Sequence, residues 1–518
     1  MATHIQNQLW TKRRIQLLLI PILLAFSFPP FNLSPLQIPA LILLFRMSHL
    51  CGSKRETILY AYPVFVLWNL FSTYWLMMAT VAGGLAAIFA NAAIMVLPLL
   101  LMRHLFRSAL SPFPVALISA GIWTSYEFLH HNWDLAWPWL TLGNAWSNQV
   151  WIIQYISVTG VFGITFWVVM TASLFYIRIA GTGFQNRKRI TRYTPELLLL
   201  LFPLISIAML FLPEQEPGDP IEVVIVQPNS DSYLTHGGHP SLQALTDHLL
   251  TLSAEVRTNQ TDVIIWPENA IDTSVSSSHP LLSQIRDSLS VWNTTLITGS
   301  GYFDFYPDQP LPAVHRTTQD GRAYNVYNSA LFLQPGESVE VYRKGRLVPI
   351  VERFPFVEFF AWADRFGWFD WGSLSGYGLG VTADLFEVNG APTPALICYD
   401  SVFPGWVNRF VKEGAGFLTI VTNDGWWGDS HGHIQHFAYA RLRAIEHRMW
   451  IARSANNGIS GIIAPSGAVH VETGYWTEEA FAYTIYTQPH PTLYSRFGNW
   501  IGYFSLLLMA AGLVRLRF

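Results

Sequence analysis

Three residues of reactive type stand at or beside short apolar runs in the second half of the chain. Glu268 follows "VIIWP", Lys344 lies in "EVYRKGRLVP", and Cys398 ends "PALIC". A carboxylate that takes a proton, a thiol that attacks a carbonyl carbon and a cation that stabilises the oxyanion form a complete set for acyl transfer. Each residue alone also has a structural interpretation, because single cysteines are usually buried and lysines usually lie in solvated segments.

A lone thiol and a histidine triplet are the other features that could carry chemistry. Cys51 is the only other cysteine and lies in the apolar first half, so Cys398 has no disulfide partner in its own half of the chain. Such a thiol is either deeply buried or retained for its reactivity. His431, His433 and His436 have spacing that could bind a metal, but histidines on a loop entering a helix more often form hydrogen bonds. We predict no metal and no cofactor.

Short apolar runs between residues 221 and 467 predict the strands that position these side chains. They cover residues 221–229, 262–269, 295–302, 328–336, 394–400, 417–424 and 460–467. Near-continuous apolar runs of this length are typical of sheets buried on both faces. Helical patterns over 239–257 and 435–455 complete an α/β sandwich. In layered folds, chemistry gathers where strands end, which is where Glu268, Cys398 and Asn423 stand.

The composition of the chain favours a membrane protein. Only 13% of the 518 residues are charged, whereas 51% are apolar. Runs that can each cross a hydrocarbon core of ~30 Å cover 15–32, 34–49, 57–79, 83–106, 112–130, 155–178, 195–213 and 500–514. We therefore predict an α-helical membrane domain of about eight spans plus an α/β domain, divided as 1–215, 216–497 and 498–518. The net charge of −3 gives no reason to expect a nucleic-acid partner.

Positive charges lie on one side of the predicted spans. Lys and Arg precede the first span and follow the second, fourth, sixth and eighth, whereas the loops after the first, third and fifth contain none. The positive-inside rule therefore predicts that both termini are cytoplasmic and that residues 216–497 lie outside the membrane.

Several motifs together resemble a known family. The ordered set "WPEN", "YRKGRLVP" and "CYD" resembles the Glu-Lys-Cys arrangement of the nitrilase superfamily. Longer segments are similar to the apolipoprotein N-acyltransferase family: "FPPF" (28–31), "WPWLTLGNAW" (137–146), "LVPIVERFP" (347–355), "NDGWWGDS" (423–430) and "RLRAIEHRMWIARSANNGIS" (441–460). The resemblance covers nearly the whole chain. It implies eight spans with a nitrilase-like αββα sandwich on the periplasmic side of a bacterial inner membrane.

The resemblance implies the last step of bacterial lipoprotein maturation. Cys398 would take an acyl group from a phospholipid, typically phosphatidylethanolamine, as a thioester. The α-amine of the diacylglyceryl-cysteine at the N-terminus of an apolipoprotein would then accept it as an amide. Glu268 would act as general base, and Lys344 would stabilise the oxyanion and favour the thiolate. Glu352 matches a second glutamate of the family, and Tyr399, Asp400 and Asn423 would support the site or bind substrate.

The chain departs from the family pattern at several positions. Asp400 stands where Glu is usual, Val351 where Gly is common, and His130 where Arg is common. The segment "VQPNSDSYLTHG" lacks the usual tryptophan, whose place either Tyr233 or His236 could fill. We expect the activity to persist, because the three reacting residues remain.

Aromatic residues crowd the segment 353–380 between glycines. They are Phe354, Phe356, Phe359, Phe360, Trp362, Phe366, Trp368, Phe369 and Trp371. Such density outside a membrane predicts a lid at the lipid interface, and the alternative is that the rings pack a core.

Two other functions compete with the acyltransferase. A membrane-tethered amidase for small soluble amides would use the same Glu-Lys-Cys set, but it would not need eight spans. A receptor or transporter would need ionisable residues along its spans, where Glu127 is the main example.

Overall fold

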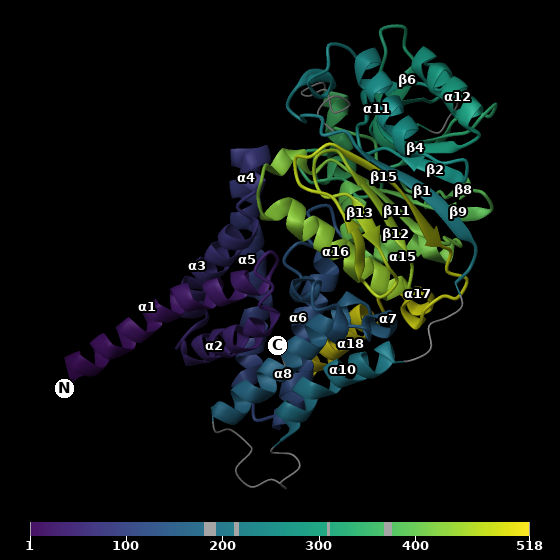
Figure 1. Ribbon diagram of the computed structural model, residues 1–518. Helices are drawn as coiled ribbons and strands as arrows, with labels where there is room; N and C mark the ends of the chain where they lie inside the picture. The colour runs from purple at the N-terminus through teal and green to yellow at the C-terminus, as the bar shows by residue number, and fades with distance from the viewer. Residues whose placement is uncertain (1, 181–192, 212–216, 308–310, 367–375, 517–518) are drawn as a thin grey trace.

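The apolar runs of the first half form helices, and the segments after residue 217 form an α/β domain stacked on them (Figure 1). The computed structural model describes residues 2–180, 193–211, 217–307, 311–366 and 376–516. The helices of the helical region are α1 (Ala2–Ser27), α2 (Gln37–Leu50), α3 (Lys54–Thr73), α4 (Leu76–Ala79), α5 (Val81–Phe106), α6 (Pro112–His130), α7 (Ile156–Thr159), α8 (Val161–Ile179), α10 (Thr194–Leu210) and α18 (Trp500–Leu516).

Each of the eight predicted apolar runs is mostly helical over its described residues, although the helices differ in length and hydropathy. Among the described residues, α5 and α8 are long and apolar enough to cross a membrane, and three shorter apolar helices cover 15–27, 194–210 and 500–515. The number of spans therefore stays a prediction. The predicted boundary at 215 falls within 212–216, and the basic segment 187–192 also lies outside the described residues.

The α/β domain contains two large sheets. Its strands are β1 (Pro220–Gln227), β2 (Thr261–Ile265), β3 (Ile271–Val275), β4 (Thr295–Phe305), β5 (Arg316–Thr317), β6 (Ala323–Leu333), β7 (Glu340–Arg343), β8 (Phe386–Val388), β9 (Ala391–Thr393), β10 (Ala395–Ile397), β11 (Leu418–Thr422), β12 (Ile451–Ala455), β13 (Gly461–Ile463), β14 (Val469–Glu472) and β15 (Glu479–Tyr486). The first sheet has the order β15-β1-β2-β4-β6-β5, with β3 beside β4 and β7 beside β6. The second has the order β10-β11-β12-β13-β14.

Successive side chains of the first sheet point to opposite faces, and both faces are buried. Val224 and Ile264 contact the core that lies under α11 (Leu242–Val256) and α12 (Pro280–Trp292). Val223 and Val263, one residue earlier in β1 and β2, belong instead to the core shared with the second sheet. This period of two is the geometry of a strand covered on both sides. With α15 (Pro404–Lys412) and α16 (His431–His447) on the second sheet, the predicted α/β sandwich is confirmed.

Helix α16 joins the α/β domain to the helical region. Phe437 and Tyr439 pack in the core of the sandwich, whereas Leu442 and Ile445 pack in the core of the helical region. The amide of Gln435 donates to the carbonyl of Ser72 over 2.9 Å, which adds a polar contact at this joint. Helix α16 therefore fixes the sandwich against the helical region. This contact positions the strand ends of the sandwich next to the helical region.

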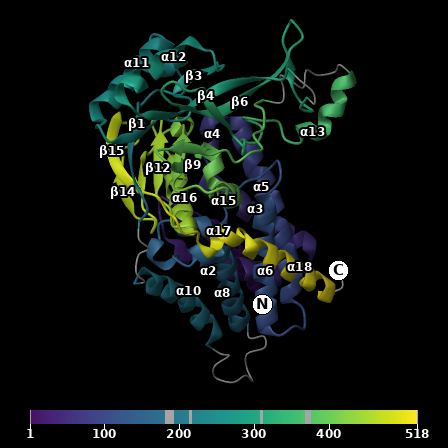
Figure 2. The same ribbon diagram turned by 90° about the vertical axis from the view of Figure 1, so that its right-hand side faces the viewer.

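The C-terminal helix α18 returns to the helical region and lies against α6 (Figure 2). A Cβ atom on Gly121 of α6 would lie 2.7 Å from Leu508 Cβ and 3.3 Å from the carbonyl oxygen of Ser505. The close approach of the two helices therefore requires glycine at this position.

We expect Gly121→Leu to lower the midpoint of thermal unfolding of the detergent-purified protein. Leucine is the better helix former, but overpacking against α18 costs about 1–3 kcal/mol. Val514→Leu, on an exposed position of α18, is the control and should leave the midpoint unchanged. A Gly121→Leu protein as stable as the parent would show that α18 does not pack here.

Candidate active site

Glu268, Lys344 and Cys398 meet at the ends of strands from both sheets. Glu268 follows β2, Lys344 follows β7 and Cys398 follows β10. Their exposed fractions are only 5%, 1% and 7%. Lysines and glutamates are almost never buried to this extent unless they are paired. Lys344 and Glu268 must therefore have charged or hydrogen-bonding partners.

That network is a buried ammonium between two carboxylates. Lys344 Nζ lies 2.8 Å from Glu352 Oε1 and 3.3 Å from Glu268 Oε1. The amide of Asn328 donates to the same two oxygens, over 3.0 and 2.8 Å. Burial alone would lower the pKa of Lys344, but the two carboxylates outweigh it and raise this pKa well above its ordinary value. The site therefore holds a permanent cation.

Backbone amides satisfy the remaining carboxylate oxygens. The N–H of Asn423 donates to Glu268 Oε2 over 2.9 Å, and the N–H of Val348 donates to Glu352 Oε2 over 2.7 Å. Asn423, which we predicted as a supporting residue, thus contacts the network through its main chain. Its side chain accepts instead from the hydroxyl of Ser232.

Asn328 was missed from the sequence, although it binds both glutamates. It lies in β6, which is otherwise buried and mostly apolar at this point. A polar side chain in a buried strand requires a partner, and that was the available signal.

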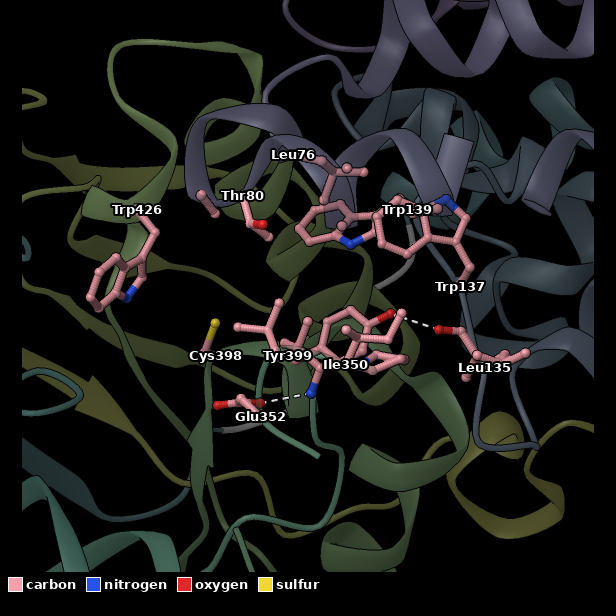
Figure 3. Close-up of a pocket in the computed structure, with 18 of the residues that line it drawn as sticks. Leu76, Thr80, Leu135, Trp137, Trp139, Ile350, Glu352, Cys398, Tyr399 and Trp426 are labelled. Atoms are coloured by element: carbon pink, nitrogen blue, oxygen red, sulfur yellow. Dashed lines mark hydrogen bonds between the residues drawn. The ribbon is translucent and has the colours of Figure 1, made fainter. Parts of the chain in front are cut away.

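Cys398 has a left-handed backbone conformation. It begins the one-turn 3₁₀ helix Cys398–Val402 with φ of +45°. A residue with a side chain adopts this region only where its surroundings impose it, and such strain concentrates at functional sites. The sharp turn directs the thiol away from the buried strand, so that it faces a cavity (Figure 3).

The thiol of Cys398 is protonated at neutral pH. Burial raises its pKa, the charge of Glu268 raises it further, and the Lys344 charge lowers it by less. Lys344 therefore favours the thiolate, as we predicted, but burial and Glu268 outweigh it, because burial penalises the charged form. Such a thiol needs a base to take its proton during attack.

Asp400 and Tyr399 stabilise the turn Cys398–Val402, called the nucleophile turn below, from two sides. The hydroxyl of Tyr342 and the N–H of Arg346 donate to the Asp400 carboxylate over 2.8 and 2.7 Å. Burial raises the pKa of Asp400 to about 7, although Lys344 and these donors oppose the shift. The hydroxyl of Tyr399 donates to the carbonyl of Ala136 over 2.9 Å, which ties the turn to the loop after α6 (Figure 3).

A cavity of about 490 Å³ extends from Cys398 into the helical region. Small residues of α5 line one wall, namely Gly83, Gly84, Ala86, Ala87 and Ala90. Tryptophans line much of the rest, including Trp75, Trp137, Trp139, Trp426 and Trp427. The space beside the thiol is therefore largely apolar and suits a hydrocarbon group.

The positions that depart from the family pattern lie around this cavity. His130 and Val351 both line it. The hydroxyl of Tyr233 donates to the carbonyl of Trp426 over 2.9 Å, and the two rings are in contact, so Tyr233 packs against a residue that lines the cavity. His236 instead pairs with Asp272. Of the two candidates for the missing tryptophan, Tyr233 is therefore the one beside the site.

The histidine triplet does not converge. His431 contacts Phe31 and Tyr74, and His433 stacks on Tyr475. His436 points into the sandwich and pairs with Asp424. These three histidines have separate partners, as hydrogen-bonding and packing side chains do.

Comparison with known proteins agrees with this architecture. Residues 223–489 match the carbon-nitrogen hydrolase family, and residues 21–174 match the apolipoprotein N-acyltransferase N-terminal domain. The α/β domain is thus a nitrilase-type carbon-nitrogen hydrolase domain that follows a helical N-terminal region.

Relatives match over nearly the full chain. Apolipoprotein N-acyltransferase of Chlorobaculum tepidum is 32% identical over 508 residues, which cover 92% of this chain and 91% of the relative. Apolipoprotein N-acyltransferase of Haemophilus ducreyi is 27% identical and covers 84% and 83%. Apolipoprotein N-acyltransferase 2 of Treponema denticola is 25% identical and covers 90% of each chain. The chain belongs to the apolipoprotein N-acyltransferase family.

Substitution of the two charges should move the reactivity of Cys398 in opposite directions. Glu268→Gln removes a charge that raises the pKa of the thiol, so alkylation by iodoacetamide at pH 8 should become faster. Lys344→Met removes a charge that lowers this pKa, so alkylation should become slower. Each unit of pKa changes the thiolate fraction about tenfold.

Acyl transfer should nevertheless fall in both variants, by about 100-fold or more, because we expect Glu268 to act as the base and Lys344 to support the oxyanion. Thermal unfolding of each variant controls for misfolding. Equal alkylation rates in the two folded variants would contradict the electrostatic account of the thiol.

Proposed function

We propose that the protein transfers an acyl group from a phospholipid to the N-terminal amine of a diacylated apolipoprotein, through a thioester on Cys398. One observation carries the proposal: a buried thiol, beside a carboxylate and an ammonium, opens onto an apolar cavity that continues into the helical region. Membership of the apolipoprotein N-acyltransferase family supports the same activity.

In the first half-reaction, Glu268 takes the proton of the Cys398 thiol as the sulfur attacks the ester carbonyl carbon. Lys344 stabilises the oxyanion, since its charge is held in place by Glu352, which also accepts a hydrogen bond from Asn328. The C–O bond to glycerol then breaks, and the leaving oxygen takes the proton from Glu268. The products are a thioester and a lysophospholipid.

In the second half-reaction, the free amine of the lipid-modified cysteine attacks the thioester carbon. Glu268 takes a proton from the amine, the C–S bond breaks, and the sulfur recovers a proton. Asp400 and Tyr399 hold the turn that carries the sulfur through both steps. No step calls for a metal or a cofactor.

The topology belongs to the same proposal. Eight helices spanning the bacterial inner membrane, with both termini in the cytoplasm, would place residues 216–497 on the periplasmic side, where phospholipid and apolipoprotein are both within reach. The division 1–215, 216–497 and 498–518 follows from this arrangement. The apolar helices α5 and α8 and the distribution of basic residues support it.

Exposed aromatic rings support a lipid-facing lid. Phe354, Phe359 and Trp362 have large exposed fractions beside α13 (Val357–Phe360), which projects from the side of the α/β domain (Figure 2). Rings that packed a core would be buried. Trp368, Phe369 and Trp371 of the same stretch lie outside the described residues.

Both rival functions fit these features less well. An amidase for small soluble amides has no use for an apolar cavity lined by a membrane-type helix. A receptor or transporter has no use for a proton acceptor and an ammonium beside a strained thiol.

The acyl-enzyme is the first test. Incubation of the purified protein with phosphatidylethanolamine that carries a labelled palmitoyl chain should give a hydroxylamine-sensitive label on Cys398. Cys398→Ser should carry no such thioester. Addition of a diacylated lipopeptide should discharge the label as an amide, whereas a small soluble amide should not compete. A folded protein that forms no acyl-enzyme with any phospholipid would refute the acyltransferase.

The cavity should also determine which chains can be transferred. Ala87→Phe would place a ring in the wall formed by α5, so we expect acyl-enzyme formation from palmitoyl donors to fall about 10–100-fold. Donors with hexanoyl chains should be much less affected, because they fill less of the cavity. Leu85→Phe, on the same helix but outside the cavity wall, is the control. An equal loss with both donors would contradict this location of the acyl chain.

A further inference from the structure

A second buried polar cluster lies beneath the nucleophile turn and has no part in the mechanism above. It consists of Asp424 after β11, His436 in α16 and Arg453 in β12, all of them buried. Asp424 Oδ2 accepts from Arg453 over 2.7 Å, and Asp424 Oδ1 lies 2.9 Å from His436 Nδ1. His436 from a helix and Arg453 from a strand thus both contact the carboxylate of Asp424.

The other nitrogen of His436 faces the nucleophile. His436 Nε2 lies 3.2 Å from the carbonyl oxygen of Cys398 and 3.1 Å from the hydroxyl oxygen of Ser401. That hydroxyl also lies 2.7 Å from the Cys398 carbonyl oxygen, and its single proton serves either this oxygen or Nε2. The histidine therefore contacts both ends of the short turn that begins with the left-handed Cys398.

Charge fixes how the imidazole is oriented. Burial opposes ionisation of Asp424, but Arg453 and then His436 outweigh it and hold the pKa of this carboxyl well below its usual range. An ionised carboxylate accepts a hydrogen bond, so it keeps the proton of the imidazole on Nδ1 and leaves Nε2 to accept from the hydroxyl of Ser401. This is how carboxylates orient histidines in catalytic and metal sites.

The same atoms do not suggest a metal site. Cys398 Sγ, a nitrogen of His436 and an oxygen of Asp424 lie within 4.8 Å of one another. However, the Asp424 oxygens are already engaged by Arg453, Thr422 and His436. A cation would have to displace a buried arginine of the same sign.

We propose that His436 is a positioning residue, which holds the Cys398 turn in its strained conformation through Nε2 and so keeps the thiol directed at the cavity. The proposal rests on the proposed acyl transfer for its role in turnover. A strained turn persists only when its surroundings over-determine it, and the hydrogen bond between Nε2 and Ser401, three residues after Cys398, adds to that constraint. His436 acts through the backbone of the nucleophile, whereas Glu268 remains the base.

Two amide substitutions separate the two sides of the imidazole. The side-chain amide of glutamine reaches the place of Nε2, where its oxygen can accept from Ser401, so His436→Gln can keep the contact with the turn. Asparagine reaches only the place of Nδ1, so His436→Asn keeps the contact with Asp424 and loses the turn. His433→Gln is the matched control, because His433 is a buried histidine of the same helix that stacks on Tyr475 outside the site.

Three quantities should be measured for each variant of the full-length protein: the rate of acyl-enzyme formation from phosphatidylethanolamine, the rate of iodoacetamide alkylation of Cys398, and the midpoint of thermal unfolding. We expect His436→Asn to slow acyl-enzyme formation about 100-fold, because displacement of a reacting group by about 1 Å has an effect of this size. We also expect the rate of alkylation of Cys398 to change. His436→Gln should recover at least tenfold of that loss at a similar unfolding midpoint. His433→Gln should acylate at the parent rate.

Two results would overturn the proposal. Equal loss in His436→Gln and His436→Asn, in step with their unfolding midpoints, would mean that the histidine serves only stability. A fully active His436→Asn protein would show that Nε2 is not needed. If the parent protein forms no acyl-enzyme at all, the acyltransferase fails, and the alkylation rates of the two variants still decide whether His436 positions the thiol.

Discussion

The buried ammonium of Lys344 between two carboxylates is the interaction on which the rest of the site depends. A charge without water is tolerated only when opposite charges and hydrogen bonds replace its hydration. Glu268 and Glu352 supply the charges, and Asn328 with two backbone amides supplies the hydrogen bonds. Because these groups come from β2, β6, β7 and the loop after β7 on the first sheet and from Asn423 after β11 on the second, the network is complete only when the two sheets pack together.

The same network explains the chemistry of the thiol. Burial and the Glu268 carboxylate keep the sulfur of Cys398 protonated at rest, and the same carboxylate is the group that can remove this proton during attack. The cation that partly offsets this effect is in place to stabilise an oxyanion. The strained turn at Cys398 then decides where the sulfur points, and His436 of α16 contacts that turn at Cys398 and Ser401.

Elements that form a continuous apolar run could be predicted from the sequence, whereas elements that mix polar and apolar residues could not. The apolar run 112–130 coincides with α6, and the run 221–229 overlaps β1, because burial on all sides leaves a continuous apolar signal. Strand β15 was missed. It pairs with β1 at the edge of the first sheet and mixes polar with apolar residues along its length, so no run marks it.

The sequence by itself determined the residue types that can transfer an acyl group, the strands that end beside them and the apolar helices near them. Only the tertiary structure decided that Lys344 binds two glutamates, that Asn328 joins them, and that the thiol rests protonated. The physical reason is that these outcomes depend on burial and on contacts between residues far apart in the chain. Lys344 and Glu268, for example, are 76 residues apart, and no local pattern encodes their distance or their dielectric surroundings.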